Sequence, residues 1–192
     1  MLRCFGSGDP LYEAYHDHEW GRPVPDSPNE SALFERLVLE GFQSGLSWVT
    51  VLRKREAFRE AFAGFDPARV AAFTTDDEQR LLGDAGIIRN RAKIAAAIGN
   101  AKTLVGMHAD GLRLADVLAK HAPAPTLAPP QTRDDIPAST PESKALSRRL
   151  KQLGFRFVGP VTMYATMQAI GLVNDHLASC WVRRGDADGP SG

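Results

Sequence analysis

The sequence has little cysteine, no excess of either charge and no long apolar run. Only two of its 192 residues are cysteines, which is too few for a disulfide framework and fits a reducing compartment. Lys plus Arg and Asp plus Glu number 23 each, which excludes a chain coated with basic residues for nucleic acid but not a local basic face. No apolar stretch reaches membrane-spanning length, and the polar first residues are not expected to form a signal peptide. We therefore expect a cytoplasmic protein with no membrane partner.

Alternation of apolar and polar residues, which would predict strands, is also missing, and no internal repeat is present. Apolar spacing instead predicts helices over residues 31–44, 48–62, 89–105, 112–118, 142–153 and 160–170, and shorter ones that open at Asp66 and Thr75. Ser47 is expected to cap the second of these. Six prolines between residues 122 and 141 predict a loop without regular structure. The fold class is therefore predicted to be all-α.

A turn bracketed by glycines at residues 154–159 joins two of the predicted helices. Backbone N–H groups at the start of the second helix suit a phosphate group. Four basic residues lie beside it in the sequence, namely Arg148, Arg149, Lys151 and Arg156. The alternative is a helical hairpin whose glycines only let two helices pack. A second turn, at residues 84–94, places basic residues at a helix start, which mildly favours an anionic partner. The alternative is a glycine that ends one helix, followed by a solvated basic helix start.

Both cysteines and three histidines lie near the ends of the chain. Two thiolates and two imidazoles are typical of structural zinc, and four protein ligands leave no position for a catalytic water. His176 and Cys180 are four residues apart at the end of a predicted helical stretch, so they would share a face. Cys4 would be joined by His16 or His18, between which the spacing does not choose. The alternative is that these side chains are simply buried or act as caps.

Glu40 lies on the apolar side of the helix predicted over residues 31–44. An unpaired buried carboxylate is costly, so Glu40 either accepts backbone N–H bonds at a neighbouring helix start or lines a ligand pocket. Four of the six Tyr and Trp residues fall in the N-terminal part of the chain, namely Tyr12, Tyr15, Trp20 and Trp48. Flat rings around one carboxylate suit an electron-poor planar ligand. The alternative is that these rings belong to the core.

Several motifs, taken in order, resemble the DNA-3-methyladenine glycosylase I family. They are Cys4, Asp9–Tyr12, Tyr15–Asp17, Glu19–Gly21, Leu39–Trp48, Asp84–Arg91, Gly154–Gly159 and Gly171–His176. The similarity extends from Cys4 to about Cys180, nearly the whole chain. It implies a helix-hairpin-helix DNA glycosylase fold in one domain over residues 1–192. Within that domain we expect a zinc-stapled lobe formed by the two ends of the chain, a central helical lobe and a flexible tail at residues 183–192.

The resemblance also implies roles for individual residues. One structural zinc ion would be held by Cys4, His16, His176 and Cys180. The pocket carboxylate would be Glu40, with the rings Tyr15, Trp48, Trp20 and Tyr12 around the base. Contacts to DNA would come from the hairpin Gly154, Phe155, Arg156, Phe157, Val158 and Gly159, and from Gly45 and Leu46, which would approach the gap left by a flipped base.

One departure from the family and two differences from related glycosylases bear on the mechanism. Family members carry a Trp just after the first Cys, where Phe5 here either supplies the ring or leaves one wall of the pocket absent. Asn174 stands where related glycosylases have a catalytic Asp. No Lys follows the second glycine of the hairpin, so no Schiff base is expected.

Together with these differences, the resemblance implies a monomeric, monofunctional enzyme that releases 3-methyladenine from alkylated double-stranded DNA and leaves an abasic site. One alternative is a zinc-stapled helix-hairpin-helix module that binds DNA without chemistry. Another is a helical protein that binds a small molecule and has no affinity for duplex DNA.

Overall fold

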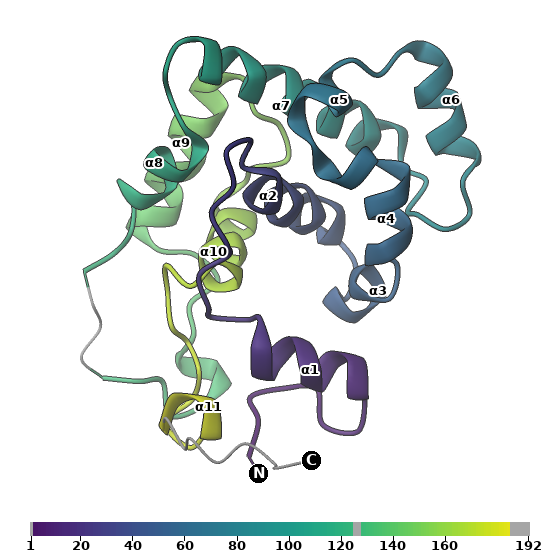
Figure 1. Cartoon of the computed structure of the whole chain (residues 1–192). Coiled ribbons are helices and arrows are strands. Elements are labelled where there is room, and N and C mark those ends of the chain that lie inside the picture. Colours follow the sequence, from purple (N-terminus) through teal and green to yellow (C-terminus); the bar gives the residue numbers. More distant parts are fainter. Residues whose placement is uncertain (1, 125–127, 185–192) are drawn as a thin grey trace.

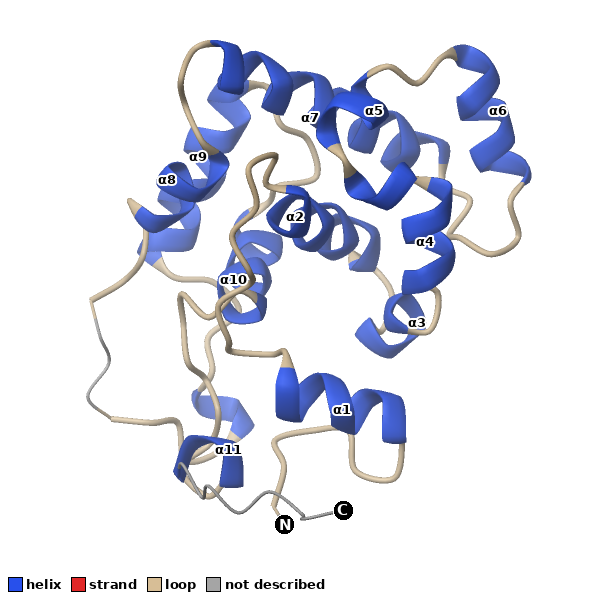
Figure 2. Cartoon of the chain, viewed as in Figure 1, coloured by secondary structure: helices blue, strands red, loops and turns tan. Residues whose placement is uncertain are grey.

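The computed structural model describes residues 2–124 and 128–184, and its regular elements in these ranges are all helical (Figure 1 and Figure 2). The longer helices are α2 (Ser31–Gln43), α7 (Arg91–Ala109), α9 (Pro141–Leu153) and α10 (Pro160–Ala169). The shorter ones are α1 (Pro10–His18), α3 (Trp48–Leu52), α4 (Arg55–Ala61), α5 (Pro67–Ala71), α6 (Thr75–Gly83), α8 (Leu114–Ala119) and α11 (Trp181–Arg184). Two 3-10 turns are η1 (Ala63–Phe65) and η2 (Arg133–Asp135). The all-α prediction is confirmed.

Helix α2 lies at the centre of the molecule and packs against α3, α7 and α10 (Figure 1). Its residues from Phe34 to Phe42 are all buried, because apolar side chains recur around most of its circumference. They form the middle of a large core to which α4, α5, α7, α8, α9 and α10 contribute. No helix in the described ranges is long and apolar enough to cross a bilayer.

A second, smaller cluster of buried side chains lies where the two ends of the chain come together. It consists of Cys4, Tyr15, Trp20, Leu52 and Cys180. Trp48 packs against this cluster and against the main core. Helices α1 and α11 occupy this end of the molecule (Figure 1).

The predicted helices do not include α1, although its start carries the same signal as that of α5. The Asp9 side chain accepts a hydrogen bond from a backbone N–H of the first turn, and Pro10 occupies the beginning of the helix. Asp66 and Pro67 do the same at α5. The apolar spacing of α1 is weak, because this helix covers a small cluster instead of the main core.

The single helix predicted over residues 48–62 is wrong, because the chain turns at residues 53–54 and forms α3 and α4. Helix α3 contacts α1, whereas α4 buries Phe58 in the main core, so one straight helix could not serve both neighbours. Ser47 stands at the start of α3 without capping its backbone. Its hydroxyl instead lies 2.7 Å from that of Thr50.

Two predictions about the C-terminal part also need correction. His176 and Cys180 do not lie on a helix, since residues 173–180 run through irregular backbone and turns. The tail predicted over residues 183–192 starts too early, because Arg183 belongs to α11 and donates a 2.7 Å hydrogen bond to the Asn174 carbonyl. Residues 185–192 lie outside the described part of the chain. The segment predicted as a loop between residues 122 and 141 contains η2.

Candidate active site and metal centre

A cavity of about 200 Å³ lies at the junction of the two hydrophobic clusters. Its walls come from α1, α2, α3, α10 and the segments that flank α1, and are made by Phe5, Tyr12, Tyr15, Trp20, Glu40, Gln43, Trp48, Ala165 and Gln168. The four aromatic residues expected around Glu40 thus line the same cavity as Glu40. Gln43 and Gln168 add two amide groups that the sequence analysis missed. Gln43 could have been found from its place one helical turn after Glu40.

The rings pack closely against one another. The centroid of Phe5 lies 4.8 Å from that of Tyr12 and 5.0 Å from that of Trp20. The rings of Tyr15 and Trp48 are 5.3 Å apart. Of the two alternatives for the segment after Cys4, the structure shows the first, because Phe5 supplies a ring to the cavity wall.

Glu40 is 5% exposed and forms no hydrogen bond or ion pair with any described residue. The alternative in which it accepts N–H bonds from a neighbouring helix is therefore wrong. Burial raises the pKa of Glu40 to about 8, and the positive charge of Arg36 opposes this rise. The carboxyl group is thus mainly protonated near neutral pH, and a cation placed beside it would favour the ionised form. Burial also raises the pKa of Tyr15, so its hydroxyl remains a hydrogen-bond donor.

An ion-pair network that the sequence analysis missed supports the cavity. Glu19 accepts hydrogen bonds from Arg55 at 2.6 and 2.9 Å and a further one from Arg36. These bonds outweigh burial and lower the pKa of Glu19 to about 2. Arg36 also lies with its guanidinium carbon 5.7 Å from the Tyr15 ring centroid. The available signal was the position of Arg36, one helical turn before Glu40 on the same face.

The raised pKa of Glu40 predicts how stability depends on pH. Because the folded-state pKa lies above the unfolded value, the stabilising contribution is complete below about pH 4.5 and is lost as pH rises through about 8. Glu40→Gln removes this loss, so its melting temperature should exceed that of the wild type by an amount that widens by roughly 3–5 °C per pH unit between about pH 5 and 8. Thermal melts of both proteins across this range measure the difference. A difference that stays constant with pH would contradict the protonation state assigned to Glu40.

The four residues expected to hold a metal come together at the second cluster. All of their ligand atoms lie within 4.8 Å of one another, and all four side chains are buried. Cys180 Sγ lies 3.4 Å from His16 Nε2 and 3.5 Å from His176 Nδ1, and Cys4 Sγ lies 3.6 Å from the same His176 atom. A zinc ion with tetrahedral ligands separates sulfur from nitrogen by about 3.6 Å. The residues therefore fit such an ion.

The groups around these ligands fix their orientation. His16 Nδ1 lies 2.8 Å from an Asp17 oxygen, and His176 Nε2 lies 3.1 Å from the Trp20 carbonyl oxygen. Each ring therefore directs its other nitrogen toward the sulfur atoms, as in many metal sites. Without a cation, burial raises the pKa of Cys4 to about 12, whereas a bound metal would deprotonate the thiol. His18 is exposed and is not part of the cluster, so His16 is the residue that joins it.

The turn at residues 154–159 connects α9 to α10. Gly154 ends α9 in the left-handed region, with φ of 105°. Phe155 and Val158 are buried beneath the turn, whereas Arg156 and Phe157 are exposed. The four basic side chains expected near this turn are exposed and form no ion pair within the described residues: Arg148, Arg149, Lys151 and Arg156. The turn thus packs two helices and also presents a positive surface.

The segment after α2 is the other one expected to approach DNA. Gly45 has φ of 83°, and Leu46 is 40% exposed although it is a large apolar residue. In the second basic turn, Arg89 and Arg91 are exposed. The side chain of Lys93 instead points inward, where its ammonium group donates hydrogen bonds to the backbone carbonyl oxygens of Phe42 and Ser44.

Comparison with known proteins identifies the family. The family model described as methyladenine glycosylase matches residues 5–184. A protein of Escherichia coli (strain K12) named DNA-3-methyladenine glycosylase 1 is 51% identical over 184 residues, which cover 94% of this chain and 96% of that protein.

Two solved structures are similar over nearly their whole length. A crystal structure of 3-methyladenine DNA glycosylase I is 48% identical, with a TM-score of 0.89 and coverage of 94% of this chain and 98% of that one. A structure of the enzyme from Staphylococcus aureus, which concerns 3-methyladenine recognition, is 38% identical, with a TM-score of 0.85 and coverage of 93% and 94%. The chain therefore belongs to the methyladenine glycosylase family.

Proposed function

We propose that this protein is a DNA glycosylase that hydrolyses the N-glycosidic bond of 3-methyladenine in alkylated double-stranded DNA. The observation that carries the proposal is the unpaired carboxyl group of Glu40 in a cavity walled by aromatic rings. The relative from Escherichia coli is named for this activity, and the structure from Staphylococcus aureus concerns recognition of this base.

The chemistry of the lesion explains how a single carboxylate can suffice. Methylation at N3 makes adenine cationic and weakens its bond to the sugar, so the base leaves as a neutral molecule and needs little acid assistance. The enzyme flips the nucleotide into the cavity, where Trp48 stacks on the base and Tyr15 and Glu40 bind its edge. The cationic base favours the ionised form of Glu40, which in turn favours the positive charge that develops on the sugar. Water adds to the sugar carbon as the glycosidic bond breaks, and the proton that it loses passes to solvent.

Selectivity follows from the same electrostatics. Unmodified adenine is neutral and has a strong glycosidic bond. In the cavity it meets a carboxyl group whose pKa of about 8 leaves it largely protonated at neutral pH. The pocket therefore offers normal adenine little of the charge stabilisation that it offers the alkylated base.

We further propose that the turn at residues 154–159 is the hairpin of a helix-hairpin-helix motif that binds the DNA backbone. Its exposed basic side chains and the N-terminus of α10 suit phosphate groups. Gly45 and Leu46 would occupy the gap left by the flipped nucleotide. The enzyme would act as a cytoplasmic monomer in which residues 1–192 form one domain. Its two lobes would correspond to the main core and to the smaller cluster at the chain ends.

We also propose that Cys4, His16, His176 and Cys180 hold one structural zinc ion. The distances between sulfur and nitrogen atoms and the pairing of both imidazole rings support this proposal. When bound, the ion would join the segments at the two ends of the chain. With four protein ligands it offers no open position to substrate.

The absence of a lysine after the hairpin supports a monofunctional enzyme. The hairpin is followed by Pro160, Val161 and Thr162, none of which can form a Schiff base. Asn174, at the place of a catalytic Asp in related enzymes, accepts the backbone N–H of His176 at 3.2 Å. It thus orders the turn that carries a proposed metal ligand.

Incubation with methylated duplex DNA, followed by chromatography of the released bases, tests the function. We expect free 3-methyladenine and abasic sites whose strands break only after alkaline treatment. Binding of the duplex without release of any base would instead indicate a DNA-binding module. Absence of both release and duplex binding would indicate a protein that binds only a small molecule.

A further inference from the structure

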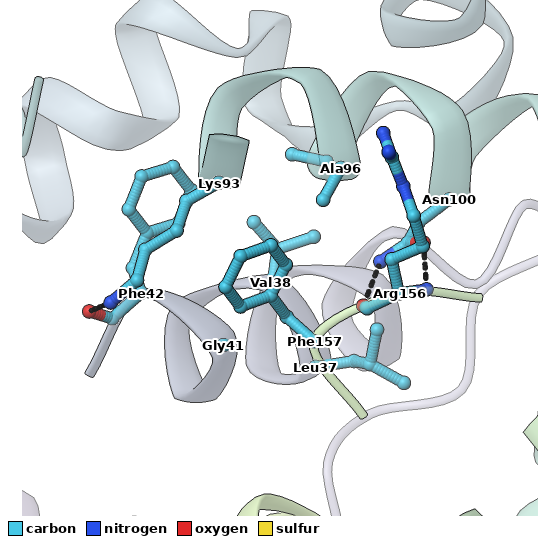
Figure 3. A pocket seen from close by; sticks show the side chains of 10 residues that line it. Leu37, Val38, Gly41, Phe42, Lys93, Ala96, Asn100, Arg156 and Phe157 are labelled. Carbon is cyan, nitrogen blue, oxygen red and sulfur yellow. Dashed lines mark hydrogen bonds between the residues drawn. The ribbon is translucent and has the colours of Figure 1, made fainter. Parts of the chain in front are cut away.

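Asn100 of helix α7 forms hydrogen bonds with the α9–α10 hairpin, and the mechanism does not use this side chain (Figure 3). The Asn100 amide nitrogen donates to the Arg156 carbonyl at 3.0 Å, and the Arg156 backbone N–H donates to the Asn100 oxygen at 2.8 Å. A single amide thus pairs with both backbone groups of a residue 56 positions away. Asn100 is only 3% exposed, so water cannot easily replace these bonds.

The hairpin needs such support because its backbone is strained. Phe157, directly after Arg156, has φ of 56°, a conformation that is uncommon for a bulky residue. Phe157 also lies against Gly41 of α2, where an added Cβ would be 3.4 Å from the Phe157 Cβ. The hairpin therefore rests on α7 and α2 together, in the orientation that exposes Arg156.

The same helix holds the end of α2 through a second buried side chain. Lys93 is 9% exposed, and its ammonium group donates to the carbonyl oxygens of Phe42 at 2.8 Å and Ser44 at 2.7 Å. Carbonyls at the end of a helix lack partners within it, so Lys93 satisfies groups that would otherwise be unpaired. Ser44 directly precedes Gly45 and Leu46, the segment proposed to enter the gap in the DNA.

Lys93 and Asn100 are seven residues apart, so both point from the same face of α7 with a separation of roughly 10 Å along its axis. Figure 3 shows the two side chains reaching down from α7 on either side of Ala96, toward the end of α2 and toward the hairpin. Small residues between them, Ala96 and Ala97, let α7 lie close to α2.

We propose that α7 is a brace that fixes the distance between the hairpin and the Gly45–Leu46 segment, with Asn100 and Lys93 as positioning residues. This inference rests on the proposed function. The DNA backbone held by the hairpin and the gap entered by Leu46 must lie at a set distance for the flipped nucleotide to reach Glu40. Small displacements of groups that position a substrate are costly to catalysis.

The proposal predicts a division of effects between the two residues. Asn100→Ala frees the hairpin and should raise the KM for duplex DNA about tenfold, with a smaller change in kcat. Lys93→Met frees the segment after α2 and should lower kcat about tenfold, with a smaller change in KM. Neither residue lines the cavity around Glu40, so binding of free 3-methyladenine should stay at the wild-type level in both variants.

Steady-state kinetics on a duplex with a single 3-methyladenine, calorimetric binding of the free base and thermal melts test these expectations. Met107→Ala is the matched control, because Met107 is a buried core residue of α7 that does not line the space between α2, α7 and the hairpin. It should lose stability and keep the wild-type KM and kcat. Asn100→Asp keeps the acceptor for the Arg156 N–H and loses the donor, so its KM should fall between those of the wild type and Asn100→Ala. If Asn100→Ala folds poorly, Asn100→Asp still tests the role of Asn100, and its KM should exceed that of the wild type.

The brace is wrong if Asn100→Ala and Asn100→Asp bind duplex as tightly as Met107→Ala, or if binding of the free base weakens in parallel with binding of DNA. The affinity of each variant for undamaged duplex is measured as well, because this measurement tests the contact with DNA even if the protein releases no base. A wild-type protein that binds duplex but releases no base would overturn the proposed glycosylase function. The effect of Asn100→Ala on duplex affinity would still test the brace.

Discussion

Replacing Glu40 with Gln is expected to lower the rate of 3-methyladenine release by about 10²–10³-fold at saturating DNA. Glutamine fills the same space and can still form a hydrogen bond with the base, but it cannot carry the negative charge that stabilises the positive charge developing on the sugar. Affinity for undamaged duplex should not change, because Glu40 lies in the cavity wall and not on the exposed basic surface. Single-turnover release of the base from a defined duplex measures the effect.

Glu35→Gln provides a control on the same helix. Glu35 accepts hydrogen bonds from Arg59 at 2.8 and 2.9 Å and does not line the cavity. Its replacement removes one carboxylate charge from α2 and is expected to reduce stability while leaving the rate of base release near the wild-type value. If the rate of base release falls equally in Glu40→Gln and Glu35→Gln, the fall results from the loss of any negative charge on α2, and the role assigned to Glu40 is wrong.

The sequence predicted Glu40 because a carboxylate on an apolar helix face requires an explanation. The same pattern located α2, whose apolar residues surround the helix and leave few alternatives to burial. The role of Arg36 could not be predicted in this way. Arg36 lies on the same face, but its significance depends on Glu19 and Arg55, which come from other segments. No spacing rule relates residues that meet only in the folded chain.

The sequence analysis did not identify Lys93 and Asn100 for a similar reason, since both bind segments that are distant in the sequence. Lys93 has the sequence context of a solvated basic helix start, yet its ammonium group is bonded to the carbonyls at the end of α2. Asn100 resembles an ordinary polar residue in an alanine-rich helix until its pairing with Arg156 is seen. Both bonds go to backbone atoms, whose exposure is set by where other elements end and not by side-chain type.

The four residues proposed to bind a metal were predicted correctly as a group, but the structure brings them together differently from what the sequence predicts. A helical spacing of four residues was the reason for pairing His176 with Cys180, and the segment is not helical. The two side chains nevertheless meet, because the Asn174 side chain accepts the His176 N–H and the Leu177 N–H donates to Cys4 Sγ at 3.3 Å. The turn is shaped by these polar contacts around the ligand cluster.

Removal of one of these ligands is expected to affect stability more than chemistry. In Cys180→Ala and His16→Ala the protein should lose the zinc that we propose it binds and should melt roughly 10 °C lower than the wild type, because metal binding is coupled to folding. The metal would join Cys4, α1 and the turn before α11, and α1 carries the Tyr12 and Tyr15 walls of the cavity. The activity of these variants should therefore fall in proportion to the unfolded fraction. At low temperature, where more of the protein is folded, the activity should return in the same proportion.

Metal analysis of the purified proteins together with thermal melts measures both parts of this expectation. His18→Ala is the matched control, since His18 lies on the same helix as His16, is exposed and is absent from the ligand cluster. It should retain one zinc per chain and the wild-type melting temperature. A Cys180→Ala protein that melts like the wild type and releases no base would assign the metal a direct part in the reaction. Full retention of zinc would show that the cluster of four is not its site, because a closed tetrahedral site cannot lose a thiolate and keep its affinity.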